Sequence, residues 1–207
     1  MLRACVAIAA LSLLIGSTPT YDSWAWMTWG REIAGGLDFD TSVGPAWKPL
    51  PVLVGAIGGP FGDLAPALWL TIARAGVLAS VALAARLAWR LASGSVLAAG
   101  VAAACVALRA GWVWNGWLGS AEGLMLALVL GAFSLALDGR HRAALALGFA
   151  AALMRTEVVP FLALYAAWLW WRSAVPRSGF AALPRRDVVV AACGFAALPL
   201  VWLVPDL

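Results

Sequence analysis

The apolar stretch of residues 143–171, AALALGFAAALMRTEVVPFLALYAAWLWW, is interrupted by charge only at Arg155 and Glu157. Its apolar residues are continuous and rich in alanine and leucine, whereas a strand of a membrane barrel alternates apolar with polar residues. Within lipid, only helices and closed barrels satisfy every backbone hydrogen bond. The stretch therefore predicts membrane helix, and its two charges raise the question of one helix or two.

Arginines that flank the stretch decide between these possibilities. Arginine and lysine concentrate in the short cytoplasmic loops of membrane proteins, and Arg142 and Arg172 lie just outside its two ends. One crossing would put them on opposite sides, whereas two short helices that turn near residues 155–157 keep both inside. Each helix would have about 14 residues, roughly 21 Å at 1.5 Å per residue. We therefore expect the turn below the outer membrane surface, in a protein-lined cavity.

The composition extends this interpretation to the whole chain. Of its 207 residues 64% are hydrophobic and 12% charged, and the mean hydropathy is +0.92, whereas soluble domains are about half apolar and a quarter charged. We predict an all-α, polytopic transmembrane helix bundle, residues 1–207 forming a single domain that is the N-terminal part of a longer protein. About seven spans are expected, at residues 2–18, 64–87, 94–110, 120–137, 143–156, 158–171 and 187–205.

The charges assign sides to these spans. With Arg3 inside, alternation places the arginine clusters of three further loops on the cytoplasmic side. The acids of the outer loops are Asp22, Glu32, Asp38, Asp40 and Asp63. We expect an integral plasma-membrane protein with a cytoplasmic N-terminus, its first span being a signal anchor or, alternatively, a cleaved signal peptide. The net charge of +4 comes from arginines dispersed among loops, which does not indicate nucleic-acid binding.

The outer loop, residues 19–63, is expected to contain two short helices. Residues 21–36, YDSWAWMTWGREIAGG, predict an interfacial helix that Asp22 or Ser23 caps and Gly35–Gly36 ends. Residues 49–60 are too short to cross and predict a juxtamembrane helix. The tryptophans on this side form either an ordinary aromatic belt or a stacking wall for a sugar or lipid; they are Trp24, Trp26, Trp29, Trp47, Trp112, Trp114 and Trp117.

Five charged residues map to this outer face: Asp22, Lys48, Glu122, Arg155 and Glu157. Each has a structural alternative. Asp22 is a helix cap, or a general base or metal ligand at the mouth of a cavity. Glu122 suits the first turn of a helix, or faces the same cavity. Arg155 and Glu157 form an ion pair, or contact a charged substrate, because ionisable groups at membrane depth usually face a partner or water.

Lys48 is the only lysine in the chain, and the positive-inside rule gives no reason for its place outside. It is either an accident of composition or a ligand for a phosphate, which Arg155 would also attract. Two further residues carry weaker expectations. Arg74, within the second span, is expected to snorkel outward or to neutralise a buried acid, and His141 to be solvated in a cytoplasmic turn.

The order of these motifs resembles that of the GT-C superfamily of membrane glycosyltransferases, which use polyprenyl-phosphate sugars. Its members include the lipid A aminoarabinose transferases and the protein O-mannosyltransferases. An acid, Asp22, follows the first span, then come an interfacial helix, SWAWMTWGREIAGG, and a proline-containing stub, WKPLPVLVGAIGGPFG. ARLAWRL closes the next span, and Lys48-Pro49 resembles the Lys-Pro of the aminoarabinose transferases. LMRTEVVPFL and GSAEGLMLAL resemble the LRPE and Ser-Glu-Pro-Leu segments of actinobacterial members, with Thr156 in place of the proline of LRPE.

The resemblance implies transfer of a sugar from a polyprenyl-phosphate donor to a glycan, lipid or protein acceptor of the cell envelope, at the extracytoplasmic face. Asp22 would be the catalytic carboxylate, and would hold a divalent cation if one binds. Lys48 would bind the donor phosphate under cover of Trp47, with Glu122, Arg155 and Glu157 as further substrate contacts. The alternatives are a multi-span transporter, whose sites lie between broken helices, and a non-catalytic membrane scaffold.

Overall fold

The computed structural model describes residues 1–36, 40–174 and 185–203, and all regular secondary structure in these ranges is helical. The predicted all-α class is therefore confirmed. Asp38 and Arg177, two charges used to assign sides, lie outside the described residues. The helices are α1 (Leu2–Leu11), α2 (Tyr21–Ala34), α3 (Pro49–Gly58), α4 (Ala65–Leu91), α5 (Val96–Ala107), α6 (Trp112–Trp117), α7 (Glu122–Leu137), α8 (His141–Ala152), α9 (Val159–Ala174) and α10 (Arg185–Leu203), with short 3-10 turns η1 (Ser12–Leu14), η2 (Gly59–Leu64) and η3 (Thr156–Val158).

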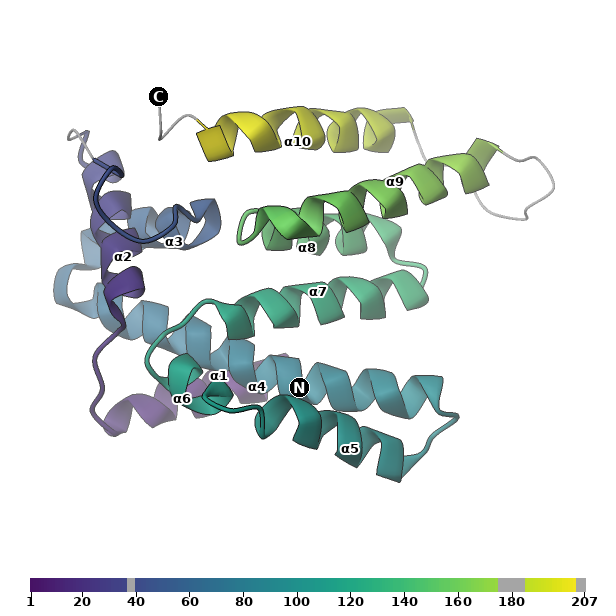
Figure 1. The fold of residues 1–207 in the computed structure, drawn as a ribbon, viewed down its shortest axis with the longest axis horizontal. Helices are drawn as coiled ribbons and strands as arrows, with labels where there is room; N and C mark the ends of the chain where they lie inside the picture. Colours follow the sequence, from purple (N-terminus) through teal and green to yellow (C-terminus); the bar gives the residue numbers. More distant parts are fainter. Residues whose placement is uncertain (37–39, 175–184, 204–207) are drawn as a thin grey trace.

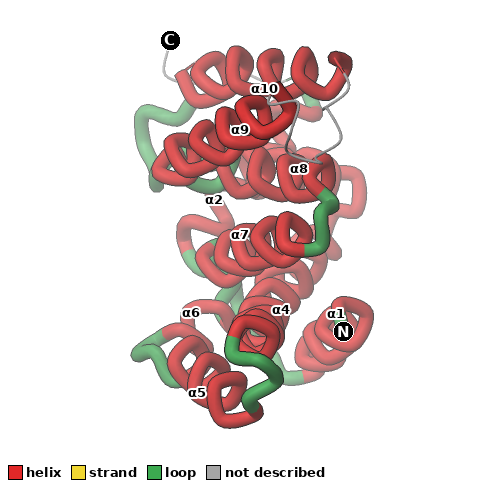
Figure 2. The backbone as a smooth tube through the Cα atoms, turned by 90° about the vertical axis from the view of Figure 1, so that its right-hand side faces the viewer, coloured by secondary structure: helices red, strands yellow, loops and turns green. Residues whose placement is uncertain are grey.

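Helix α4 is the longest helix and organises the bundle. It packs against α1, α5 and α7, while α7 continues the stack to α8, and α8 to α9 and α10. Figure 1 shows these helices running alongside one another, and Figure 2 shows the same stack from its end. Helix α2 instead crosses one end of the stack and packs on α3. This is the arrangement expected of an interfacial helix followed by a juxtamembrane helix.

The apolar helices differ in whether they are long enough to cross a bilayer. Within the described residues, one helical stretch, Pro49–Leu91, is long and apolar enough to span a bilayer; it is kinked at Gly62, and within it α4 alone has 27 residues, about 40 Å at 1.5 Å per residue. The other apolar helices are shorter: Leu2–Leu14, Val96–Ala107, Glu122–Leu137 and Val188–Leu203. Helix α5 has only 12 residues, about 18 Å against a hydrocarbon core of ~30 Å. Seven crossings therefore stay a prediction.

The division of residues 143–171 into two helices is confirmed. Helix α8 ends at Ala152, Arg155 has extended backbone with φ −153° and ψ 131°, and α9 begins at Val159. Proline follows at 160, in the first turn, where its missing N–H leaves no hydrogen bond unmade. At the opposite end of the bundle, Arg90 at the end of α4 pairs with Asp138 after α7 at 2.7 Å. That pair brings together two loops that the charge pattern assigns to the same side.

The first turns of α2 and α3 differ in how well the sequence predicted them. Helix α3 begins at Pro49, as expected, with Lys48 at its N-cap position, and its end is followed by Gly62 in the left-handed region at φ 54°. The predicted cap of α2 was wrong. Thr20 occupies the N-cap position, and the hydroxyl of Ser23 donates to the carbonyl of Gly119 at 2.8 Å. Ser23 is fully buried there, so a tertiary contact uses the hydroxyl.

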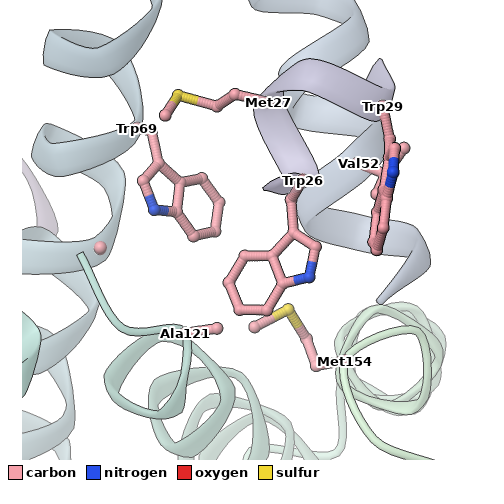
Figure 3. Close-up of a cluster of buried hydrophobic side chains, with 8 residues drawn as sticks. Trp26, Met27, Trp29, Val52, Trp69, Ala121 and Met154 are labelled. Atoms are coloured by element: carbon pink, nitrogen blue, oxygen red, sulfur yellow. The ribbon is translucent and has the colours of Figure 1, made fainter. Parts of the chain in front are cut away.

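The core at the end of the stack crossed by α2 is built on tryptophan and methionine. Trp26 of α2 and Trp69 of α4 are almost completely buried and meet edge to face, with ring centroids 5.9 Å apart. Met154, which follows α8, is buried against them (Figure 3). Aromatic pairs of this geometry contribute about 0.5–1.5 kcal/mol beyond the area that they bury. The cluster thereby fixes α2 and the turn between α8 and α9 in one place.

Arg74 does neither of the two things expected of it. Its guanidinium is buried, donating from Nε to the carbonyl of Trp117 at 3.1 Å, from Nη1 to the hydroxyl of Ser12 at 2.8 Å, and from Nη2 to the hydroxyl of Ser17. It also lies 4.0 Å from the centre of the Trp117 ring. Arg74 therefore ties the segment after α1 and the end of α6 to α4.

Replacing Arg74 with leucine is expected to lower the free energy of unfolding by about 2–3 kcal/mol, because a buried carbonyl and two hydroxyls lose their donor. Arg74→Lys should recover only part of this loss, since an ammonium lacks the planar fork that serves three acceptors at once. Denaturant titration in mixed micelles measures both variants. Equal stability of the leucine variant and the natural chain would contradict this account.

His141 is not the solvated loop residue that the sequence suggested. It is the first residue of α8 and half-buried, and its Nδ1 lies 2.8 Å from the hydroxyl oxygen of Tyr165 on α9. The ring of Trp168, one turn further along α9, is 6.3 Å from the imidazole. His141 is thus part of the α8–α9 contact.

Candidate functional site

Lys48 points into the protein and not outward from its surface. The residue is only 8% exposed, its Nζ lies 3.4 Å from Oε1 of Glu122, and it stands 4.6 Å from the centre of the Trp26 ring. The backbone explains this direction. The N–H of Leu50, in the first turn of α3, donates to the carbonyl of Leu153 at the end of α8. Helix α3 therefore starts against the α8–α9 turn and directs Lys48 at Glu122.

Glu122 is the centre of the cluster. Its Oε1 accepts from Lys48 at 3.4 Å and from Nη2 of Arg155 at 3.3 Å, and its Oε2 accepts from the hydroxyl of Ser120. It also opens α7, where the unpaired N–H groups of the first turn favour a negative charge. Its predicted place in a helical first turn is observed, whereas the cavity that it was expected to share with Asp22 contains Arg109, Arg155 and Glu157 instead. The carboxylate is held by groups from three separate parts of the chain.

Arg155 and Glu157 form the outer part of the cluster. Nη1 of Arg155 is 3.6 Å from Oε1 of Glu157, and their side chains are 42% and 70% exposed. Both residues line a cavity of about 580 Å³, together with Glu122, Arg109 and Trp112. The predicted ion pair is present, and the guanidinium also borders an open cavity. The structural and functional interpretations of this pair are therefore compatible.

Arg109 is a residue of this cavity that the sequence reasoning missed. It follows α5, and its guanidinium lies 5.3 Å from the centre of the Trp112 ring. No ion pair of Arg109 is observed within residues 1–36, 40–174 and 185–203. The signal that singled out Lys48 could have found it, because Arg109 is also a basic residue in a loop assigned to the outer side.

Asp22 and Trp47 are not brought into this cavity. Asp22 is exposed in the first turn of α2; its neighbour Ser23 binds the carbonyl of Gly119, three residues before Glu122. Trp47 donates from Nε1 to the carbonyl of Val201 on α10 at 3.0 Å, and it lines a separate cavity of about 370 Å³ with Trp202. Neither residue lines the cavity that contains Arg155.

The predicted stacking wall of α2 is mostly inside the protein. Trp26 and Trp29 are 2% and 4% exposed, whereas Trp24 is 46% exposed. The two buried indoles hold the loop before Lys48: Trp26 donates to the carbonyl of Ala46 at 3.2 Å and Trp29 to that of Asp40 at 3.0 Å. In the same loop, hydrogen bonds from the side chain and backbone of Ser42 hold the pKa of Asp40 below its ordinary value. Trp26 and Trp29 therefore face the protein core and form neither an exposed belt nor a stacking surface, because their rings are needed for packing.

The carboxylates of the site are matched to cations of the protein. Over the part of the chain that the structure describes, no three His, Cys, Asp or Glu side chains come close enough together to hold a metal ion. Glu122 and Glu157 pair with Lys48 and Arg155, and Asp22 is the only other acid that the sequence placed at the site. The two carboxylates within the site are thus engaged by cations of the protein, and the chemistry proposed below uses no metal ion.

Comparisons with protein-family models, with curated proteins and with solved structures found no match to this chain.

Proposed function

We propose that this protein is a membrane glycosyltransferase of the GT-C type that moves a sugar from a polyprenyl-phosphate donor to an acceptor at the extracytoplasmic face. The observation that carries the proposal is the cavity in which Arg109 and Arg155 stand beside Glu157, backed by the ion pair of buried Lys48 with half-buried Glu122. A phosphate is the ligand that a pair of accessible guanidinium groups suits best. The order of motifs in the sequence, which resembles that superfamily, is the second support.

The structure redistributes the roles that the resemblance suggests. Arg155 and Arg109 border the open cavity, so they contact the donor phosphate directly. Lys48 is enclosed and bonded to Glu122, so it acts through its charge: it keeps Glu122 in place, and Glu122 in turn orients Arg155. Lys48 is thus a positioning residue in this proposal, and Arg155 replaces it as the principal phosphate ligand.

In the transfer step, the hydroxyl oxygen of the acceptor attacks the anomeric carbon of the donor sugar. The bond from that carbon to the phosphate oxygen breaks, and the phosphate keeps the electron pair. Glu157, whose carboxylate is 70% exposed in the wall of this cavity, takes the proton of the acceptor hydroxyl as general base, whereas Asp22, to which the resemblance gave that role, lies outside the cavity. Negative charge grows on the phosphate as the bond breaks, so fixed guanidinium groups stabilise the transition state more than the ground state.

The test is transfer from a polyprenyl-phosphate sugar by the full-length protein in proteoliposomes. Arg155→Ala is expected to lower the rate about 10²-fold or more, the effect of losing one fixed donor to a developing charge. Glu157→Gln should lower it by a similar factor, the usual contribution of a general base. Arg90→Ala is the matched control, because Arg90 pairs with Asp138 at the opposite end of the bundle. Rates unchanged in both site variants would overturn the proposal.

A transporter is the second candidate, and the short pair of helices α8 and α9 favours it. Transport sites lie between helices broken at membrane depth, and the turn at Arg155 and Glu157 separates two short helices in a similar way. Uptake of a labelled sugar phosphate into proteoliposomes, abolished in Arg155→Ala, would support transport. Transfer without uptake would support the enzyme, and a protein with neither activity would be a scaffold.

A further inference from the structure

One face of α7 and one face of α9 together form a groove that the chemistry above does not use. Its residues on α7 recur every three or four positions, from Val129 through Ala132 and Phe133 to Leu137, and α9 contributes Phe161 and Tyr165 in the same way. Such spacing places residues on a single helix face. The floor is made of small residues of α8, Ala144 and Gly148, and the cavity measures about 490 Å³.

The groove continues from the charged cavity at Arg155. The two cavities share Val129, Val158 and Phe161 in their walls, so together they run along α7 from Glu122 to Leu137. This distance is about 22 Å at 1.5 Å per residue. Among the residues that line the two cavities, charged ones lie only at the Glu122 end, and Phe133 and Phe161, which are 51% and 73% exposed, leave the side open. The far end is closed by Tyr165 and Trp168, where His141 meets the Tyr165 hydroxyl.

The charge at the open end selects an anionic head. Two cations line the outer cavity, Arg109 and Arg155, and a third, Lys48, lies behind Glu122. The carboxylates of Glu122 and Glu157 balance two of these three positive charges, which leaves a net charge of one. A single phosphate monoester or diester complements that balance. An ordinary zwitterionic lipid fills the apolar part equally well but leaves the positive charge unmatched.

We propose that this groove, residues 129–168 on α7, α8 and α9, holds the first isoprene units of a polyprenyl phosphate whose head lies against Arg109 and Arg155. The inference rests on the proposed function, because it takes the lipid class from there, and it adds the place of the chain. Ala132 and Ala136 give the groove its width at mid-depth. A bulky side chain at Ala132 therefore blocks the chain about 15 Å from Glu122, without touching the head site.

The experiment measures dissociation constants of undecaprenyl phosphate, geranyl phosphate, undecaprenol and dioleoyl phosphatidic acid for the purified full-length protein in detergent. The natural chain is expected to bind undecaprenyl phosphate at least about tenfold more tightly than geranyl phosphate, because burying about two further methylene groups already gives that factor. Ala132→Trp should lose this preference while still binding geranyl phosphate. Ala163→Trp, on an exposed position of α9 outside the groove, should keep it.

The remaining outcomes separate the groove from the head site. Unchanged chain-length preference in Ala132→Trp, with all phosphates lost in Arg155→Ala, would overturn the groove and leave the proposed function standing. Equal binding of undecaprenol or phosphatidic acid would show that the groove takes any bilayer lipid, which also overturns the inference. Failure of every phosphate to bind would overturn the proposed function as well. Ala136→Phe is the second blocking variant if Ala132→Trp does not fold.

Discussion

Replacing Glu122 with alanine is expected to lower the free energy of unfolding by about 3 kcal/mol, the lower end of the range for breaking a buried ion pair. The cost arises because Lys48 is 8% exposed and would keep its charge without the carboxylate that it contacts at 3.4 Å. Arg155 loses less, since Glu157 remains within 3.6 Å of it. Denaturant titration in mixed micelles measures the change.

Two variants control for this result. Glu157→Ala removes a carboxylate that is 70% exposed, and exposed pairs contribute only about 0–1 kcal/mol. The double variant Lys48→Met with Glu122→Leu removes both charges, and apolar replacement of a whole buried pair is often neutral. We expect the double variant to be more stable than Glu122→Ala alone. Strict additivity of the Lys48 and Glu122 substitutions would show that the two residues are not coupled.

Replacing Gly30 with alanine is expected to separate α2 from α3 and to lower the free energy of unfolding by about 3 kcal/mol, the upper part of the usual range for overpacking. A Cβ at this position would lie 2.4 Å from both the amide nitrogen of Ala56 and the carbonyl oxygen of Val52. Backbone atoms cannot rotate away as a flexible side chain can. Because Lys48 directly precedes α3, the shift should also lower transfer activity.

Gly100 is the matched control for Gly30. It lies within α5, and a Cβ added there meets no other atom within 4 Å. Gly100→Ala should leave transfer unchanged and raise stability by about 0.5–1 kcal/mol, because alanine favours helix over glycine. If the two alanine variants behave alike in the same titration, the close approach of α2 and α3 does not limit stability.

Patterns local in the sequence predicted the secondary structure well. The charged interruption at residues 155–157 predicted two helices in place of one, and Pro49 marked the start of α3, because proline fixes φ and lacks an N–H wherever it occurs. Local patterns predicted side chains less well. Ser23 and Trp26 had the composition of a cap and of an interfacial aromatic, but both are buried. Their partners come from remote segments, which no local pattern can show.

Within the candidate site, the sequence predicted correctly which charged residues lie at the same end of the bundle. It did not predict which of them come into contact. Alternation of helices places Lys48, Glu122 and Arg155 at one end, and these three meet in one cluster. Asp22 belongs to the same end by the same argument, yet it lines neither the cavity of Arg155 nor the groove beyond it. Assigning a residue to one end of the bundle locates it only to within about the length of a helix. The two charged groups of an ion pair must lie within a few ångströms of each other.

The sequence by itself determined that this chain is helical, apolar and divided into short helices with charges near their ends, because hydropathy and proline act on each segment independently. Only the tertiary structure decided which of those charges meet. The hydrogen bond from Leu50 to Leu153 sets the start of α3 against the α8–α9 turn and directs Lys48 inward. That contact joins residues about a hundred positions apart, and long-range packing alone produces it.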